Sequence, residues 1–181
     1  MNLLPLLLLS CQDHLLVPNG TMPHSVLNEL PESNESGQSN SGKDSSYDEF
    51  TPIHVYELDV LNSINDHRSG VSLPSLEMHP LLVDVAREHS MDMAYGDVSF
   101  GHAGFEDRID TFLERVSHTT YRAAENVGQA SGDEAVNITV DMWLNSEGHR
   151  DNIEGPYHFT GIGAFEQNGA VYFTQIFLAV E

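Results

Sequence analysis

The chain has 181 residues, enough for one domain with its own core, and its 28 acidic and 7 basic side chains give a formal net charge of −21. Such a charge repels nucleic acids and anionic membrane surfaces, so neither is expected as a partner. The one cysteine, Cys11, lies near the N-terminus. We therefore expect no disulfide, no thiolate nucleophile and no cysteine-based zinc site in the folded part.

The first fifty residues divide into two stretches. Residues 1–11 are apolar and too short to span a bilayer, which indicates an export signal rather than a short buried or disordered start. Leu-Leu-Ser before Cys11 also resembles the end of a bacterial lipoprotein signal, and a lipid on Cys11 would then be the membrane attachment. Residues 12–50 are polar and poor in large apolar side chains, which is the composition of a disordered linker.

Residues 51–181 carry the patterns of a folded domain that begins with two helices. Thr51-Pro52 is a cap followed by proline at the first helical position, and the first helix should stop before Ser69-Gly70. Its apolar residues recur every three positions: Val55, Leu58, Leu61 and Ile64. A second helix can begin at Pro80, with an apolar stripe of Leu82, Val85, Ala86, His89 and Met93. We interpret His89 as a hydrogen-bonded core histidine rather than a ligand.

Two further helices and a hairpin complete the predicted domain. A third helix is indicated by Ile109, Phe112, Leu113 and Val116. Ser131 and Glu134 predict a capping box for a fourth helix, whose inward residues would be Val136, Val140, Trp143 and Leu144. Two β-rich runs, 159–166 and 170–178, are joined by Gln167-Asn168-Gly169, a tight-hairpin signal. Helices followed by antiparallel strands favour the α+β class.

Ionisable side chains are concentrated in one stretch, residues 141–163. Within twelve residues it holds Glu147, His149, Arg150, Asp151 and His158, and apolar residues such as Trp143 and Ile162 lie on either side. A segment that is buried at its ends and polar in its middle is suited to form the rim of a cleft.

Seven short segments, in this order, resemble the CAP family of cysteine-rich secretory proteins, antigen 5 and pathogenesis-related 1, also called SCP-like, in its bacterial disulfide-free form. They are LNSINDHR (61–68), AREHSMDMA (86–94), GHAGFEDRI (101–109), AAENVGQA (123–130), WLNSEGHRDNI (143–153), HFTGIGA (158–164) and YFTQIF (172–177). The resemblance implies a three-layer α–β–α sandwich, with helices packed on a small antiparallel sheet and an open cleft on one side. It also implies a secreted protein, extracellular or in the cell envelope.

The cleft of this family carries two histidines and two glutamates. The resemblance matches the first histidine to His102, the first glutamate to Glu125 and the last histidine to His158. The second glutamate position, three residues after the tryptophan, holds Ser146 here, and Glu147 comes one residue later. His149 is a rival occupant of the same region. The candidate cleft residues are therefore His102, Glu125, Glu147, His149 and His158.

The chemistry of these residues allows a metal site. Two neutral imidazoles, His102 and His158, can hold zinc or another divalent cation and leave positions open for water or ligand. A carboxylate, Glu125 or Glu147, would orient an imidazole or take a proton from bound water. The alternative for Glu125 is a structural carboxylate that accepts backbone N–H groups. Arg150 is expected to pair with an acid, and Asn126 to bond the backbone.

Three functions fit these residues. The first is a secreted binding module whose acidic cleft, with or without a metal, holds a small apolar, peptide or cell-envelope ligand. The second is a metal-dependent, peptidase-like hydrolase that uses Glu125 or Glu147 as its base, and the third is a structural envelope domain. The sequence has no GxSxG, no HExxH and no phosphate-cradling glycine loop, so we favour the binding module over an enzyme. Nothing in the sequence indicates the oligomeric state.

Overall fold

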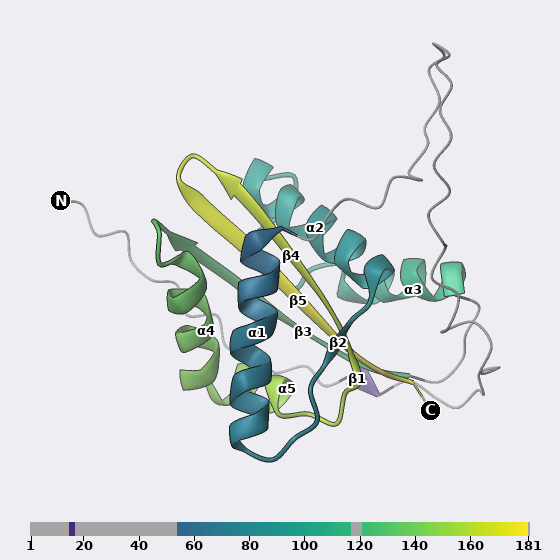
Figure 1. Ribbon diagram of the computed structural model, residues 1–181. Coiled ribbons are helices and arrows are strands. Elements are labelled where there is room, and N and C mark those ends of the chain that lie inside the picture. The colour runs from purple at the N-terminus through teal and green to yellow at the C-terminus, as the bar shows by residue number, and fades with distance from the viewer. Residues whose placement is uncertain (1–14, 17–53, 117–120, 181) are drawn as a thin grey trace, which may run out of the picture.

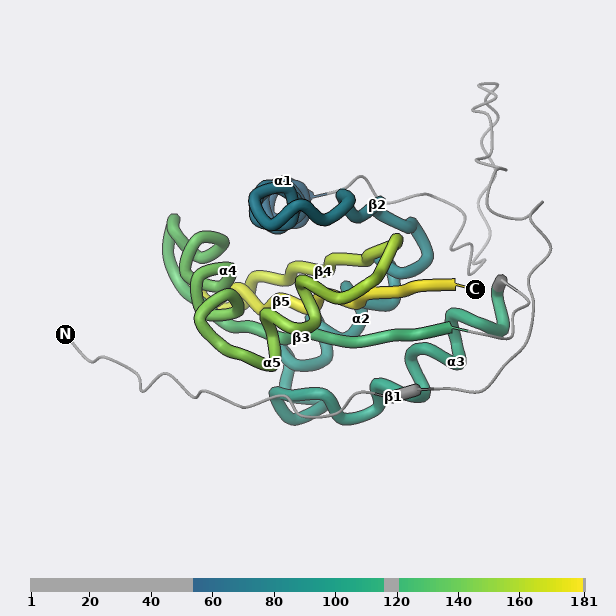
Figure 2. Tube along the Cα trace, turned by 90° about the horizontal axis from the view of Figure 1, so that it is seen from below, coloured from purple at the N-terminus to yellow at the C-terminus, as the bar shows by residue number. Residues whose placement is uncertain are grey.

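The computed structural model describes residues 15–16, 54–116 and 121–180 (Figure 1). The predicted export signal, almost all of the predicted linker and the expected cap at Thr51-Pro52 lie outside the described residues. Within them, one sheet is covered by helices on both sides, with α1 on one side and α2 and α3 on the other (Figure 2). The predicted α+β class and three-layer α–β–α arrangement are confirmed.

The sheet has the strand order β1-β3-β5-β4-β2. Three long strands, β3 (Tyr121–Ser131), β4 (Phe159–Gln167) and β5 (Ala170–Val180), pair antiparallel. At the edges, β1 (Leu15–Leu16) pairs antiparallel with β3, and β2 (Glu77–Met78) runs parallel to β4, so the sheet is mixed. Asn168 and Gly169, with φ of 53° and 77°, form the two-residue turn between β4 and β5, which confirms the predicted hairpin.

Two helices, α2 (Pro80–Tyr95) and α3 (Phe105–Val116), cover one face of the sheet. The predicted stripe of α2 is confirmed, since all five of its members are buried. The helix lies unusually close to β4, because a Cβ on Gly161 or Gly163 would stand 2.2 Å from the backbone carbonyl carbon of Leu82 or Ala86, respectively. These two glycines set the distance between α2 and the sheet.

The other face is covered by α1 (Val55–Gly70) and α4 (Ala135–Asn145), and the short α5 (Glu147–Ile153) follows α4. The predicted stripe of α1 is wrong in part, since Val55 is 60% and Leu58 46% exposed. Positions three apart advance by about 300°, so such a run drifts around the helix. The buried face is instead formed by Glu57, Val60, Ile64 and Arg68.

Three further local predictions differ from the structure. The capping box of Ser131 and Glu134 is wrong, because Ser131 ends β3, and Glu134 at the N-cap of α4 makes no side-chain capping bond. The strand β3, between the third and fourth helices, was not predicted. The polar stretch after Trp143 contains the seven-residue helix α5. No helix in residues 54–116 and 121–180 is both long enough and apolar enough to cross a membrane.

Candidate functional site

The site is built around a buried carboxylate, that of Glu125 in β3, which is 3% exposed. Glu125 pairs in register with Ile176, whose side chain packs with α2 and α3, so the two side chains share that face. Arg108 of α3 holds both carboxylate oxygens: its Nε donates to Oε2 at 3.1 Å and its Nη2 to Oε1 and Oε2 at 2.8 Å. The carboxylate thus has a cationic partner where water is largely excluded.

His102 is the side chain that this carboxylate presents to the surface. Its Nδ1 lies 3.0 Å from Oε1 of Glu125, and its side chain is 26% exposed. An ionised carboxylate only accepts hydrogen bonds, so Nδ1 carries the proton and donates it. In the neutral ring Nε2 then has the lone pair. Orientation of an imidazole by a carboxylate is the arrangement found behind metal-binding histidines.

His149 comes to the same site from α5, and it is 7% exposed. Burial lowers the pKa of His149, and the neighbouring His102 ring lowers it further. Nδ1 of His149 is buried without a hydrogen-bond partner among the described residues. Asn126, next to Glu125 in β3, donates from Nδ2 to the His149 carbonyl at 3.1 Å, as its predicted backbone role requires. Consecutive residues of β3 therefore hold the two histidine segments, one from each face of the sheet.

His158 lies in a different place. It is exposed, and its backbone N–H donates to the Leu178 carbonyl just before β4. Glu125 shares its row of the sheet with Gly161, which is two strands away and three residues after His158. With about 4.8 Å between strands and 3.3 Å per residue, the Cα atoms of His158 and Glu125 are about 14 Å apart. The predicted pairing of His102 with His158 is not what the structure brings together.

The rivalry between Glu147 and His149 is decided by burial. Glu147 is exposed in the first turn of α5, whereas His149 is directed inward. Arg150, which was expected to pair with an acid, donates from Nη1 to the Leu144 carbonyl at 3.0 Å and so holds the bend between α4 and α5. His102, Glu125 and His149 form the assembled part of the predicted set, and Glu147 and His158 lie outside it.

A divalent cation would find two imidazoles here and little else. His102 offers Nε2, and His149 adds the second ring. Within residues 54–116 and 121–180, no three His, Cys, Asp or Glu side chains are grouped as a metal site. The donor set fits a two-imidazole site whose remaining positions would be filled by water or ligand.

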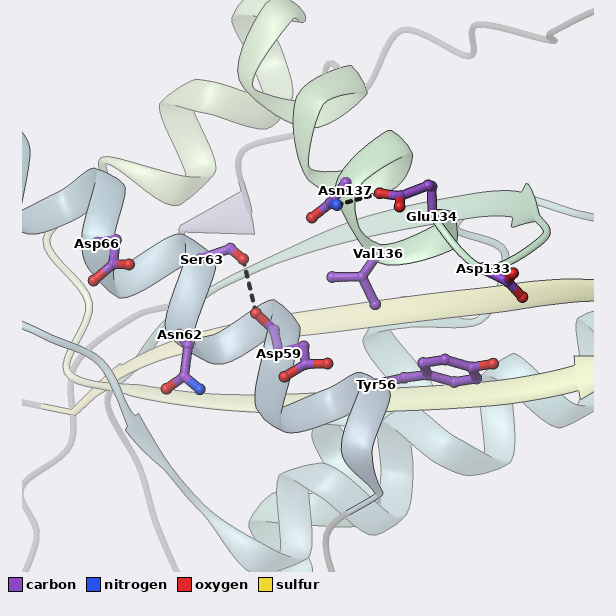
Figure 3. A pocket seen from close by; sticks show the side chains of 9 residues that line it. All are labelled: Tyr56, Asp59, Asn62, Ser63, Asp66, Asp133, Glu134, Val136 and Asn137. Atoms are coloured by element: carbon purple, nitrogen blue, oxygen red, sulfur yellow. Dashed lines mark hydrogen bonds between the residues drawn. The ribbon is translucent and has the colours of Figure 1, made fainter.

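The acidic groove of this domain is separate from the histidines. A groove of about 340 Å³ lies between α1 and the start of α4, and it is lined by Tyr56, Asp59, Asn62, Ser63, Asp66, Asp133, Glu134, Val136 and Asn137 (Figure 3). It opens on the α1 and α4 face, whereas Glu125 and Arg108 lie on the α2 and α3 face. The sequence predicted one acidic His/Glu cleft, and the structure separates the acidic groove from the histidine pair.

Sequence reasoning missed Arg108, the partner of Glu125. A signal was present, because the whole chain has only seven basic residues. A buried carboxylate needs a cation, and Arg108 lies within the same quoted segment as His102. Its pairing across 17 residues with Glu125 depends on how α3 packs on β3, which no local pattern reports.

Comparisons with known proteins agree with this fold. Residues 61–177 match the sequence model described as the cysteine-rich secretory protein family, CAP. Over 131 residues the chain is 32% identical to the uncharacterized protein YkwD of Bacillus subtilis, a match that covers 70% of this chain and 48% of that protein. The chain thus spans about half the length of this curated relative.

Two solved structures are also similar. An extracellular protein containing an SCP domain from Bacillus anthracis is 29% identical with a TM-score of 0.53, covering 67% of this chain and 39% of that one. An outer surface protein of Borrelia burgdorferi is 20% identical with a TM-score of 0.56, covering 70% and 93%. At that identity the second likeness supports the fold alone.

Proposed function

The chain belongs to the cysteine-rich secretory protein (CAP) family, and on that premise we propose that it is an extracytoplasmic binding module whose ligand contacts are His102 and His149. The location rests on its similarity to a protein described as extracellular and on the apolar residues 1–11. A lipid on Cys11 remains the proposed means of attachment to a membrane.

The observation that carries the proposal is the Arg108–Glu125–His102 chain. Glu125 is buried and neutralised by Arg108, yet one of its oxygens also holds Nδ1 of His102. Burying a carboxylate to orient a partly exposed imidazole has an energetic cost, and core packing alone does not need it. The benefit is a fixed Nε2 lone pair at the surface, beside the ring of His149.

The ligand is proposed to carry a group that imidazole nitrogen binds, with a divalent cation such as Zn²⁺ as the simplest case. The remaining coordination positions would take water or an oxygen of a peptide or cell-envelope molecule. The acidic groove is lined mainly by polar and charged side chains, so it does not favour a small apolar ligand.

The geometry gives the hydrolase alternative little support. A general base needs a lone pair within reach of the water that it activates. Both oxygens of Glu125 accept from Arg108, and one of them also holds His102. The second candidate base, Glu147, is exposed and lies outside the assembled residues.

Zn²⁺ titration by calorimetry tests the proposal. The matched variants are His102→Ala, His149→Ala and His158→Ala, measured with excess Ca²⁺ to occupy groove carboxylates, because Ca²⁺ prefers oxygen ligands and Zn²⁺ accepts nitrogen. We expect the first two to weaken Zn²⁺ binding at least about tenfold and His158→Ala to leave it unchanged. Equal Zn²⁺ binding by all four proteins, or loss only in His158→Ala, would contradict the proposal.

A further inference from the structure

His89 of α2 is a buried polar side chain that the proposed site does not yet use. It is 2% exposed, and its Nε2 lies 2.9 Å from the carbonyl oxygen of Gly101. A carbonyl only accepts hydrogen bonds, so Nε2 carries the proton and donates it. Burial lowers the pKa of His89, against the opposing effect of the Glu125 carboxylate, which keeps the ring neutral near pH 7.

The residue that His89 holds is the one directly before His102. Gly101 is buried and has a φ of 140°, a backbone conformation that residues with a Cβ rarely adopt. It lies in the segment that leaves α2 after Gly96 and enters α3 at Phe105. The orientation of the Gly101 peptide fixes the direction in which the backbone of His102 begins.

The chain after His102 is held in a similar way. The N–H of Phe105 donates to the His102 carbonyl at 3.0 Å, and Nη1 of Arg108 donates to the Ala103 carbonyl at 2.8 Å. Both of these bonds come from the start of α3. The bond from His89 is the side-chain anchor on the other side of His102, and it comes from α2.

We propose that His89 is a positioning residue for His102, which acts through its hydrogen bond to the Gly101 carbonyl and keeps Nδ1 of His102 within reach of Glu125. The inference rests on the proposed function for its consequence, since a fixed His102 ring matters only if that ring binds a ligand. Its structural content does not depend on a ligand. Loss of the anchor frees the Gly101 peptide to rotate, and the His102 ring then leaves its single tautomer.

The test uses ring ¹⁵N chemical shifts of His102 in the full-length protein without added cation, together with Zn²⁺ affinity. His89→Leu removes the donor at similar volume, and His89→Gln keeps an N–H donor near the position of Nε2. Val85→Ala is the matched control, because it removes buried volume one turn earlier in α2 without a polar contact.

We expect His89→Leu to replace the Nδ1-protonated signature of His102 by a tautomer mixture and to weaken Zn²⁺ binding about tenfold. His89→Gln should restore both, and Val85→Ala should change neither. An unchanged His102 signature in folded His89→Leu, no rescue by His89→Gln, or an equal effect in Val85→Ala would overturn the inference. If His89→Leu fails to fold, the comparison of His89→Gln with the wild type decides.

The two proposals fail separately in this experiment. A His102 ring that responds to His89→Leu in a protein that binds no Zn²⁺ would support the positioning role and contradict the proposed cation site. Zn²⁺ binding that depends on His102 while its ring ignores His89→Leu would contradict the positioning role alone.

Discussion

Replacing Arg108 by methionine tests the buried pair that holds the site together. Arg108 makes three contacts of 2.8–3.1 Å with Glu125, whose side chain is 1% exposed, and Arg108 itself is 14% exposed. Removing one partner of a buried ion pair costs about 3–5 kcal/mol, because the remaining charge is left uncompensated. The Arg108→Met variant should therefore lose about 3 kcal/mol or more of unfolding free energy, and its Tm should fall by about 10 °C.

Urea unfolding, with calorimetry for the Tm, measures this loss, and two further variants make it specific. Arg115→Met removes an exposed arginine in the last turn of the same helix and should change the free energy by at most about 0.5 kcal/mol. The double variant Arg108→Met with Glu125→Gln removes the stranded charge and should recover part of the loss. A loss below about 1 kcal/mol in Arg108→Met, or an equal loss in Arg115→Met, would refute the reasoning.

Two further predictions concern packing and pH. Gly163→Ala should lose about 3 kcal/mol or more in urea unfolding, since its Cβ would meet the α2 backbone, whereas Gly70→Ala, which meets nothing within 4 Å, should be neutral or slightly stabilising. Similar losses in both would contradict this account of the α2 contact. Burial lowers the folded-state pKa of three histidines, so the unfolded chain binds more protons below its pKa of about 6.5: His79, His89 and His149. Unfolding free energy should fall as pH drops from 7 to 5, by at most about 1.4 kcal/mol per unit per histidine. A slope that His79→Leu leaves unchanged would argue against the part assigned to His79.

The contrast between α2 and α1 shows which parts of the fold are readable from the sequence. The stripe of α2 follows the three- and four-residue spacing that keeps side chains on one face, and all its members are buried. On the buried face of α1 two charged residues, Glu57 and Arg68, find partners elsewhere in the chain. Arg87 binds Glu57 from α2, and Arg68 donates to backbone carbonyls between residues 74 and 157. A local pattern reads charge as exposure and cannot report distant partners.

The site was predictable to a similar degree. His102 and Glu125 followed from the family resemblance, and the structure joins them by a hydrogen bond. The choice between His149 and His158 depends on the third dimension, because both lie close together in the sequence. Helix α5 carries His149 toward the β3 edge, while the start of β4 lies two strands away. Sequence proximity offered no means of separating them.

An anomalous difference map from crystals of the protein grown with Zn²⁺ tests the central claim most directly. The account predicts a peak about 2.1 Å from Nε2 of His102 and from a ring nitrogen of His149, with Nδ1 of His102 still bonded to Glu125. A peak on His158, a peak only among the groove carboxylates, or no peak near His102 would contradict it.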